Sequence, residues 1–167
     1  GTGVYLICSK TELIEKAELL TNEFGQQLVV EEYVPGNEVS VSILGTSNRS
    51  YVYACLEFVN KDGSIMELFD YESKYVKGFK AISPQLEPDV IDFVCSQSLL
   101  IHNKTGFRDI SRIDWKIKNN IPYFIEATPL PAFDRDSDFD IGSRIRGRSF
   151  DDVINDVIMS AMSRRNM

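Results

Sequence analysis

The chain has 167 residues, of which 43% are hydrophobic and 26% charged, a composition typical of a soluble protein. The net charge of −7, with no basic stripe, argues against a nucleic-acid partner, and no apolar stretch reaches the ~20 residues of a membrane span. We therefore expect a single cytoplasmic domain over residues 1–167.

Few residues are available for thiol or imidazole chemistry. Cys8, Cys55 and Cys95 show no CxxC spacing, so we predict three reduced thiols rather than a disulfide framework or a zinc site. The single histidine, His102, falls in a predicted helix, and we expect it to be packed or on the surface rather than catalytic.

The first half of the chain predicts one helix and then strands. Ser9 and Glu12 have the spacing of a capping box, helical apolar spacing follows, and Gly25 is a natural stop. Strands are predicted over residues 28–34, 39–44 and 51–59. In the second strand valine and isoleucine alternate with serine, which places Glu38 on the serine face, away from the core.

The second half begins with a long aperiodic segment, residues 68–88, and loops of this length tend to be functional. Beyond it we predict a helix from Pro88 to near Gly106, strands at about 109–118 and 122–128 hinged at Asn119-Asn120, a polar stretch over 129–140, and a last helix capped by Ser149. This order predicts an α+β fold with an antiparallel sheet flanked by helices.

The most informative residues lie on the two predicted strands of the hairpin. A hairpin loop of three or five residues would place Asp114 opposite Glu126, and Arg112 opposite Thr128. Two carboxylates at ~4.5–5.5 Å share a proton, pair with the arginine, or hold a divalent metal. The pattern by itself leaves these three alternatives open.

Two further clusters are weaker signals. In the segment 69–75, Lys74 is either part of a solvated loop or a point charge that reaches a phosphate. Residues 31–38 form a strand followed by a Pro-Gly turn, whose backbone groups can read the edge of a base.

Taken in order, four motifs resemble the D-alanine–D-alanine ligase family of ATP-grasp enzymes over essentially the whole chain. They are residues 30–38 (Val-Glu-Glu-Tyr-Val-Pro-Gly-Asn-Glu), 70–75 (Asp-Tyr-Glu-Ser-Lys-Tyr), 112–114 (Arg-Ile-Asp) and 126–131 (Glu-Ala-Thr-Pro-Leu-Pro). The resemblance implies the carboxyl-terminal, ATP-binding part of an ATP-grasp fold, and a fragment of a longer protein.

The resemblance also implies roles for single residues. Glu31 would accept from the adenine amino group, backbone at Glu32 and Val34 would read the rest of the base edge, and Glu38 would hold the ribose hydroxyls. Lys74 would contact the ATP phosphates, and residues 1–4 resemble the loop that folds over them. Asp114 and Glu126 would bind magnesium (or manganese), Arg112 would stabilise the acyl phosphate, and Ser137 would bind the carboxylate of the second substrate.

The sequence departs from the family at two of these places. Thr128 stands where the family has an asparagine whose amide oxygen binds magnesium, so one metal site is expected to be weaker or filled by water. Ala132 replaces a glycine whose backbone N–H faces the reacting oxyanion, and alanine restricts that backbone.

The expected activity is an ATP- and magnesium-dependent ligation of a carboxylate to an amine, such as two D-alanine molecules, for peptidoglycan precursors of the cell wall. A ligase for other amino acids, and a nucleotide-binding domain without ligase activity, are the alternatives. We expect the chain alone to be inactive, and homodimerisation of the full-length protein is left open.

Overall fold

A computed structural model of the chain describes residues 3–66, 68, 76 and 78–164. Its elements are α1 (Lys10–Phe24), β1 (Asn37–Thr46), the short helix η1 (Ser47–Arg49), β2 (Tyr51–Asn60), β3 (Phe79–Ile82), α2 (Pro88–Thr105), β4 (Arg108–Lys118), β5 (Ile121–Thr128), α3 (Asp138–Ile145) and α4 (Phe150–Arg164). The expected α+β class is confirmed: the five strands form one antiparallel sheet in the order β3-β2-β1-β4-β5.

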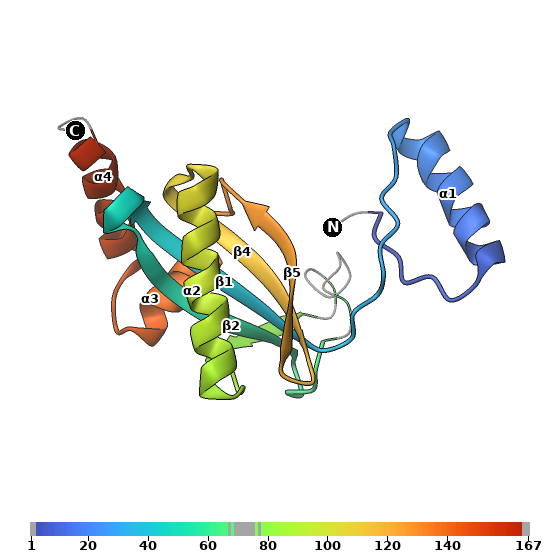
Figure 1. Cartoon of the computed structure of the whole chain (residues 1–167), viewed down its shortest axis with the longest axis horizontal. Coiled ribbons are helices and arrows are strands. Elements are labelled where there is room, and N and C mark those ends of the chain that lie inside the picture. The colour runs from blue at the N-terminus through green and yellow to red at the C-terminus, as the bar shows by residue number, and fades with distance from the viewer. Residues whose placement is uncertain (1–2, 67, 69–75, 77, 165–167) are drawn as a thin grey trace.

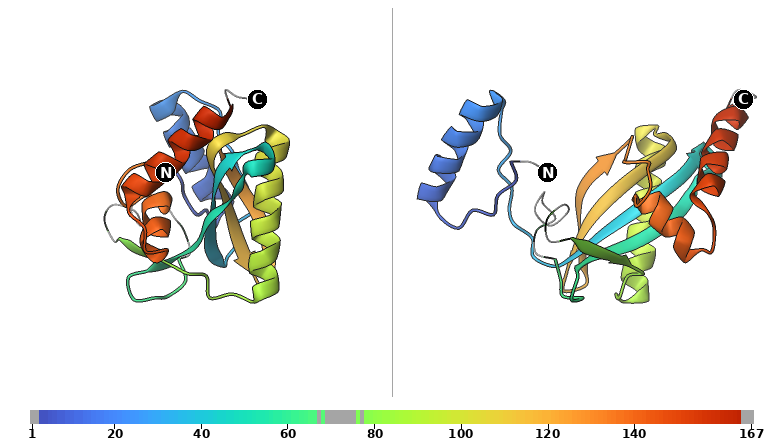
Figure 2. Two further views of the ribbon diagram at one scale, coloured as in Figure 1. Left: turned by 90° about the vertical axis from the view of Figure 1, so that its left-hand side faces the viewer. Right: turned by 180° about the vertical axis from the view of Figure 1, so that it is seen from behind.

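Helices cover both faces of the sheet, as Figures 1 and 2 show. Val39, Val41 and Ile43 of β1 point to the face under α2, where they form a core with Ile113 and Trp115 of β4. The opposite face carries a second core with α3 and α4, built from Leu44, Tyr53, Ala54, Leu56, Ile110, Phe139, Phe150 and Val153. We call the sheet and helices α2–α4 the sheet body.

Most predicted elements are present and end where their capping residues indicate. The Ser9 hydroxyl accepts from Glu12 N (3.2 Å) at the start of α1, and Gly25 ends it in the left-handed conformation. Gly106 ends α2 in the same way. Before α4, the Ser149 hydroxyl accepts from Asp152 N (3.2 Å).

Two short elements fall in segments that were expected to be irregular. β3 lies in the predicted long loop, and its four residues are too few to show a period. α3 lies partly in the aspartate-rich stretch, where Ser137 caps its first turn and acidic residues suit the positive end of a helix.

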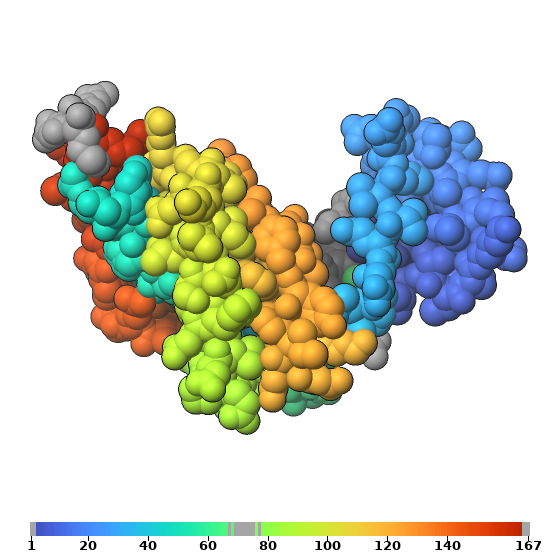
Figure 3. All heavy atoms as spheres, in the orientation of Figure 1, coloured from blue at the N-terminus to red at the C-terminus, as the bar shows by residue number. Residues whose placement is uncertain are grey.

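The prediction of a strand over residues 28–34 is wrong. This run is extended but belongs to no strand, and it leads from α1 to the sheet body. Val29 and Val30 are 81% and 70% exposed, and Leu20 is the buried residue of α1. We call residues 3–36 the amino-terminal segment; Figure 3 shows a broad notch between its α1 part and the sheet body.

Gly36 joins the two parts at a point where only glycine fits. Its φ is +144°, and a Cβ there would collide with the backbone carbonyl of Ile117. The close approach holds the start of β1 against the end of β4.

Among the helices that the structure describes, none combines the length and the apolar character needed to cross a membrane.

Candidate functional site

Arg112 and Asp114 on β4 and Glu126 on β5 meet on the face of the sheet that carries α3. Asp114 pairs with Glu126 and Arg112 with Thr128 across the two strands, so the predicted register is confirmed. Arg112 Nε donates to Asp114 Oδ1 (2.9 Å), and Arg112 Nη2 donates to Asp114 Oδ2 (2.7 Å) and to Glu126 Oε1 (3.3 Å). One guanidinium therefore binds both carboxylates.

The register is correct although the predicted loop length is wrong. Lys118 pairs with Ile121, so the turn has two residues, Asn119 and Asn120, both with positive φ. Continued regularly, this turn would pair Asp114 with residue 125 and turn Glu126 to the other face. A bulge intervenes, because Trp115 pairs with Phe124 while Asp114 pairs with Glu126, and Ile125 is the extra residue.

A third carboxylate, Asp138, was not predicted as part of the site. It is the first residue of α3; its Oδ2 accepts from the Ser40 hydroxyl (2.6 Å) and lies 3.9 Å from Arg112 Nε. Its only sequence signal was the run of aspartates at 134, 136, 138 and 140. We call Arg112, Asp114, Glu126 and Asp138 the arginine–carboxylate cluster.

The charge on Arg112 is secured by these carboxylates. Burial alone would lower its pKa, but Asp114, Asp138 and Glu126 outweigh burial and raise the pKa of Arg112 above its ordinary value. The site thus contains a permanent, part-buried cation held by two strands and a helix.

Glu38 lies on the same face, opposite Lys116 in the β1–β4 pairing. Its Oε2 is 2.8 Å from Lys116 Nζ. The expectation that the serine face points away from the core needs correction, because Ser40 and Ser42 are both buried. α3 packs on this face, so β1 has a covered surface on both sides.

The other predicted residues are more scattered. Glu31 and Glu32 are exposed in the amino-terminal segment, not on the sheet, and Val34 is half-buried there. Thr128 is half-buried beside the cluster, and Ala132 is exposed in the loop after β5.

Ser137 has a structural role that the sequence did not reveal. Its hydroxyl donates to Asp134 O (2.6 Å) and caps α3. Lys74, with its motif, and residues 1–2 lie outside the described residues.

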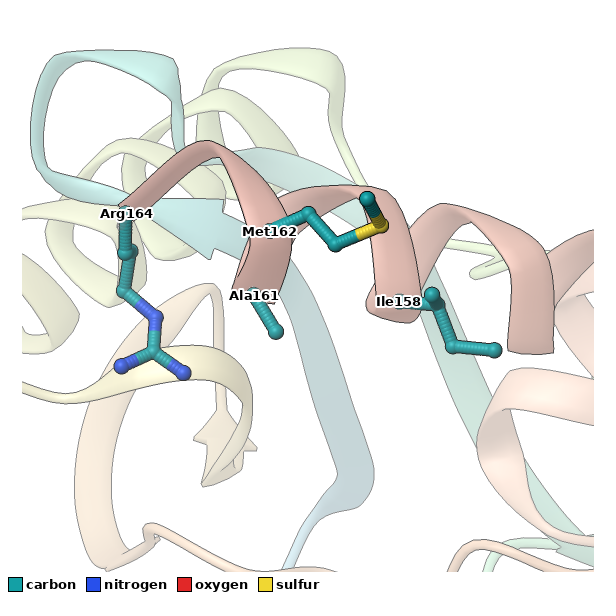
Figure 4. Close-up of a pocket in the computed structure, with 4 residues that line it drawn as sticks. All are labelled: Ile158, Ala161, Met162 and Arg164. Carbon is teal, nitrogen blue, oxygen red and sulfur yellow. The ribbon is translucent and has the colours of Figure 1, made fainter. Parts of the chain in front are cut away.

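Open hollows lie at two places among the described residues. One, of about 550 Å³, lies where the amino-terminal segment meets the β4–β5 turn, and part of the 30–38 motif contributes to its lining. The residues that line it are Leu6, Tyr33, Pro35, Gly36, Asn37, Ile65, Ile117, Lys118 and Asn119. The other, of about 540 Å³, lies along α4 (Figure 4) and shares no residue with the cluster. The first has the size of a small-molecule site and adjoins the predicted nucleotide motif.

The donor set suits a metal ion that is held partly by protein carboxylates and partly by the phosphate oxygens of a bound nucleotide. Asp114 and Glu126 offer hard carboxylate oxygens side by side, but no three acidic, histidine or cysteine side chains within residues 3–66, 68, 76 and 78–164 form a complete metal site. Magnesium is commonly bound by one or two carboxylates plus phosphate oxygens and water. The cluster fits that pattern when one oxygen of Asp114 exchanges its hydrogen bond with Arg112 for the metal ion.

Known proteins are similar to this chain in sequence and in fold. The chain is 30% identical to the D-alanine–D-alanine ligase of Carboxydothermus hydrogenoformans, over 98% of this chain and 52% of that protein, and 30% identical to that of Petrotoga mobilis, over 97% and 53%. It thus spans about half the length of these relatives.

Solved structures show the same fold. The Bacillus anthracis D-alanine–D-alanine ligase complexed with ATP matches with a TM-score of 0.76 at 22% identity, over 97% of this chain and 51% of that one. The VanG D-Ala:D-Ser ligase of Enterococcus faecalis matches with a TM-score of 0.73 at 24% identity, over 93% and 45%. The expected ATP-grasp fold is confirmed.

Residues 1–159 match the model of the family described as D-ala D-ala ligase C-terminus. With the cross-strand pair of carboxylates on Arg112 and a related sequence along nearly its whole length, the chain belongs to this D-alanine–D-alanine ligase carboxyl-terminal family.

Proposed function

We propose that this chain is the nucleotide- and metal-binding part of an ATP-dependent ligase that joins two D-alanine molecules into a dipeptide for the cell wall. The observation that carries the proposal is the direct pairing of Asp114 with Glu126 at the guanidinium of Arg112. The relatives named above are D-alanine–D-alanine ligases, and one related structure holds ATP. The reaction takes place in the cytoplasm, and the partners are ATP and amino acids.

The chemistry accounts for the absence of a nucleophilic side chain from the proposed roles. A carboxylate oxygen attacks the γ-phosphorus of ATP and ADP leaves; the amine then attacks the acyl carbon, phosphate leaves and the amine loses a proton. Charge gathers on phosphoryl and acyl oxygens, which calls for fixed cations. Magnesium bound by Asp114 and Glu126 would neutralise phosphate charge.

Arg112 supplies the fixed positive charge. Its contacts to Asp114 and Glu126 hold the guanidinium beside the position proposed for the metal. Lys74 supplies a second cation to the phosphates, Glu31 and the backbone at Glu32 and Val34 bind the adenine, and Glu38 binds the ribose.

The proposal predicts that Arg112→Ala lowers kcat of the complete ligase by on the order of 10²–10³, the scale for loss of one oxyanion-stabilising group. A matched control is Arg148→Ala, because Arg148 also pairs with an aspartate, Asp156 (2.6 Å), outside the cluster. Release of phosphate with D-alanine as substrate measures both. An unchanged kcat in Arg112→Ala would exclude this role.

The metal role has its own test. Asp114→Asn removes one carboxylate charge and should raise the magnesium concentration at half-maximal rate roughly tenfold or more. Asp156→Asn is the control. Equal magnesium dependence in the two variants contradicts the metal assignment.

The isolated chain serves as a further check. We propose that it binds ATP weakly and catalyses nothing unaided, because its relatives are about twice as long. Calorimetry giving micromolar affinity for Mg-ATP, or phosphate release by the chain alone, contradicts this.

A second candidate function is ligation of a different amino acid. Thr128 and Ala132, which differ from the family at the metal and oxyanion positions, favour it, and the VanG structure is a D-Ala:D-Ser ligase on the same fold. A panel of amino acids given to the complete protein separates the two. Ser137, proposed to bind the second substrate's carboxylate, is the residue to vary in that panel.

A further inference from the structure

Lys116 is a buried cation to which the proposed function assigns no role. It lies on β4 two residues after Asp114, on the same face, and is only 8% exposed. A buried ammonium group is costly unless it is paired and hydrogen-bonded. A methionine or leucine would fill this place without that cost, so the partners of Lys116 must explain its presence.

The ammonium group reaches oxygen atoms of three separate segments. Nζ lies 2.8 Å from Glu38 Oε2, and it donates to Met66 O (3.1 Å) and Gly36 O (3.3 Å). The ammonium group thus donates to two backbone carbonyls and forms an ion pair with the Glu38 carboxylate. Lys116 therefore links the junction at Gly36, strand β1 and the end of the described run at Met66.

The pairing with Glu38 is built into the sheet. Glu38 and Lys116 are direct partners in the β1–β4 register, and the pairing continues through Ser40 with Asp114 and Ser42 with Arg112. The Glu38 side chain is 14% exposed, so its contact with Lys116 is poorly screened by water. The pair places one carboxylate oxygen firmly and leaves acceptor capacity on the group.

We propose that Lys116 is a positioning residue that holds Glu38 in place to bind the ribose hydroxyls of the nucleotide. This inference rests on the proposed function, in which Glu38 is the ribose ligand. A direct contact of Lys116 with phosphate is disfavoured, because moving Nζ would break three contacts and leave the Glu38 charge without this partner.

The experiment compares nucleotides that differ only in their ribose hydroxyls. Affinities of the complete ligase for Mg-ATP and for Mg-2′,3′-dideoxy-ATP are measured by calorimetry in the wild type, Lys116→Met and Lys116→Arg. The control is Lys104→Met, which changes an exposed lysine at the end of α2.

We expect the wild type and Lys104→Met to prefer ATP over the dideoxy nucleotide by roughly tenfold, the value of one hydrogen bond to a charged group. In Lys116→Met this ratio falls toward one, through weaker binding of ATP and not of the dideoxy nucleotide. Lys116→Arg keeps the charge and restores part of the preference. In a Glu38→Gln background, Lys116→Met changes the ratio no further.

The outcomes separate this inference from the function on which it rests. If the wild type binds no ATP, the proposed function fails and the inference fails with it. If the wild type prefers ATP and Lys116→Met keeps that preference, or lowers the affinity for both nucleotides by the same factor, the inference alone is overturned. Should Lys116→Met not fold, Lys116→Gln, which keeps donors for the two carbonyls, decides by the same ratio.

Discussion

Two runs of similar composition, residues 28–34 and residues 39–44, have different fates. Both are rich in β-branched residues, yet the second is part of the central strand β1, whereas the first is an exposed extended segment. β1 is hydrogen-bonded on both sides, to β2 and β4. Its Val39, Val41 and Ile43 are fully buried, whereas Val29 and Val30 are mostly exposed.

The two runs show that β propensity describes a side chain that fits a sheet, and that neighbours decide whether a strand forms. β1 has a neighbour on each side. β2 (residues 51–60) follows it after a short connection and pairs with one edge, and β4 (residues 108–118), the first strand of the β4–β5 hairpin, pairs with the other. Residues 28–34 take part in no strand pairing within the described part of the chain.

The largest predicted effect is on the free energy of unfolding, and it distinguishes one shortened side chain in β1 from one in residues 28–34. Ile43→Ala removes buried methyl groups from the core under α2 and should lower the free energy of unfolding by about 2–5 kcal/mol. Val29→Ala should change it by less than about 0.5 kcal/mol, because the side chain is already in water. Urea denaturation followed by Trp115 fluorescence measures both. Similar losses in the two variants would show that residues 28–34 are packed.

The sheet body could be predicted closely because its signals are local. Capping residues mark an end of α2 and of α4, and alternation marks β1 and β4. The features that the sequence does not predict depend on distant contacts. β3 is held by its pairing with β2. The bulge at Ile125 contains no glycine or proline from which the sequence could have predicted it.

The site divides in the same way. Arg112, Asp114 and Glu126 could be predicted because one hairpin contains all three. Asp138 and Ser40 are 98 positions apart and meet only when α3 packs on the sheet. Lys116 carries no sequence signal of its own on this alternating strand, and only the fold reveals its contact with Met66 O.

The next effect tests the joint between the two regions. Gly36→Ala places a Cβ against the Ile117 carbonyl and demands a φ that alanine rarely adopts, so we expect a loss of about 1–3 kcal/mol. Gly25→Ala is the control: φ there is also positive, but an added Cβ meets nothing within 4 Å. Thermal unfolding should show the larger decrease in Tm for Gly36→Ala. The reverse order would mean that the joint is not tightly packed.

The smallest effect is a pH dependence confined to the sheet body, where the only histidine lies. His102 is fully buried in α2, so it is packed as expected; Nδ1 lies 2.7 Å from the Ser111 hydroxyl and Nε2 lies 3.2 Å from Gly45 O. A carbonyl only accepts, so Nε2 carries the proton and Nδ1 accepts from serine.

Burial lowers the pKa of His102, although Gly45 O and Asp109 act in the opposite direction. Unfolded histidine has a pKa of about 6.5, so as the pH falls below that value the unfolded chain takes up a proton that the folded chain refuses. His102 thus stabilises the fold fully above about pH 6.5, and this stability is lost as the pH falls toward the lower pKa of the folded state. The gap in unfolding free energy between the wild type and His102→Gln should therefore narrow from pH 7.5 to pH 5. The ring C–H resonances of the single histidine report its titration directly, and a midpoint at or above 6.5 in the folded protein would refute the argument.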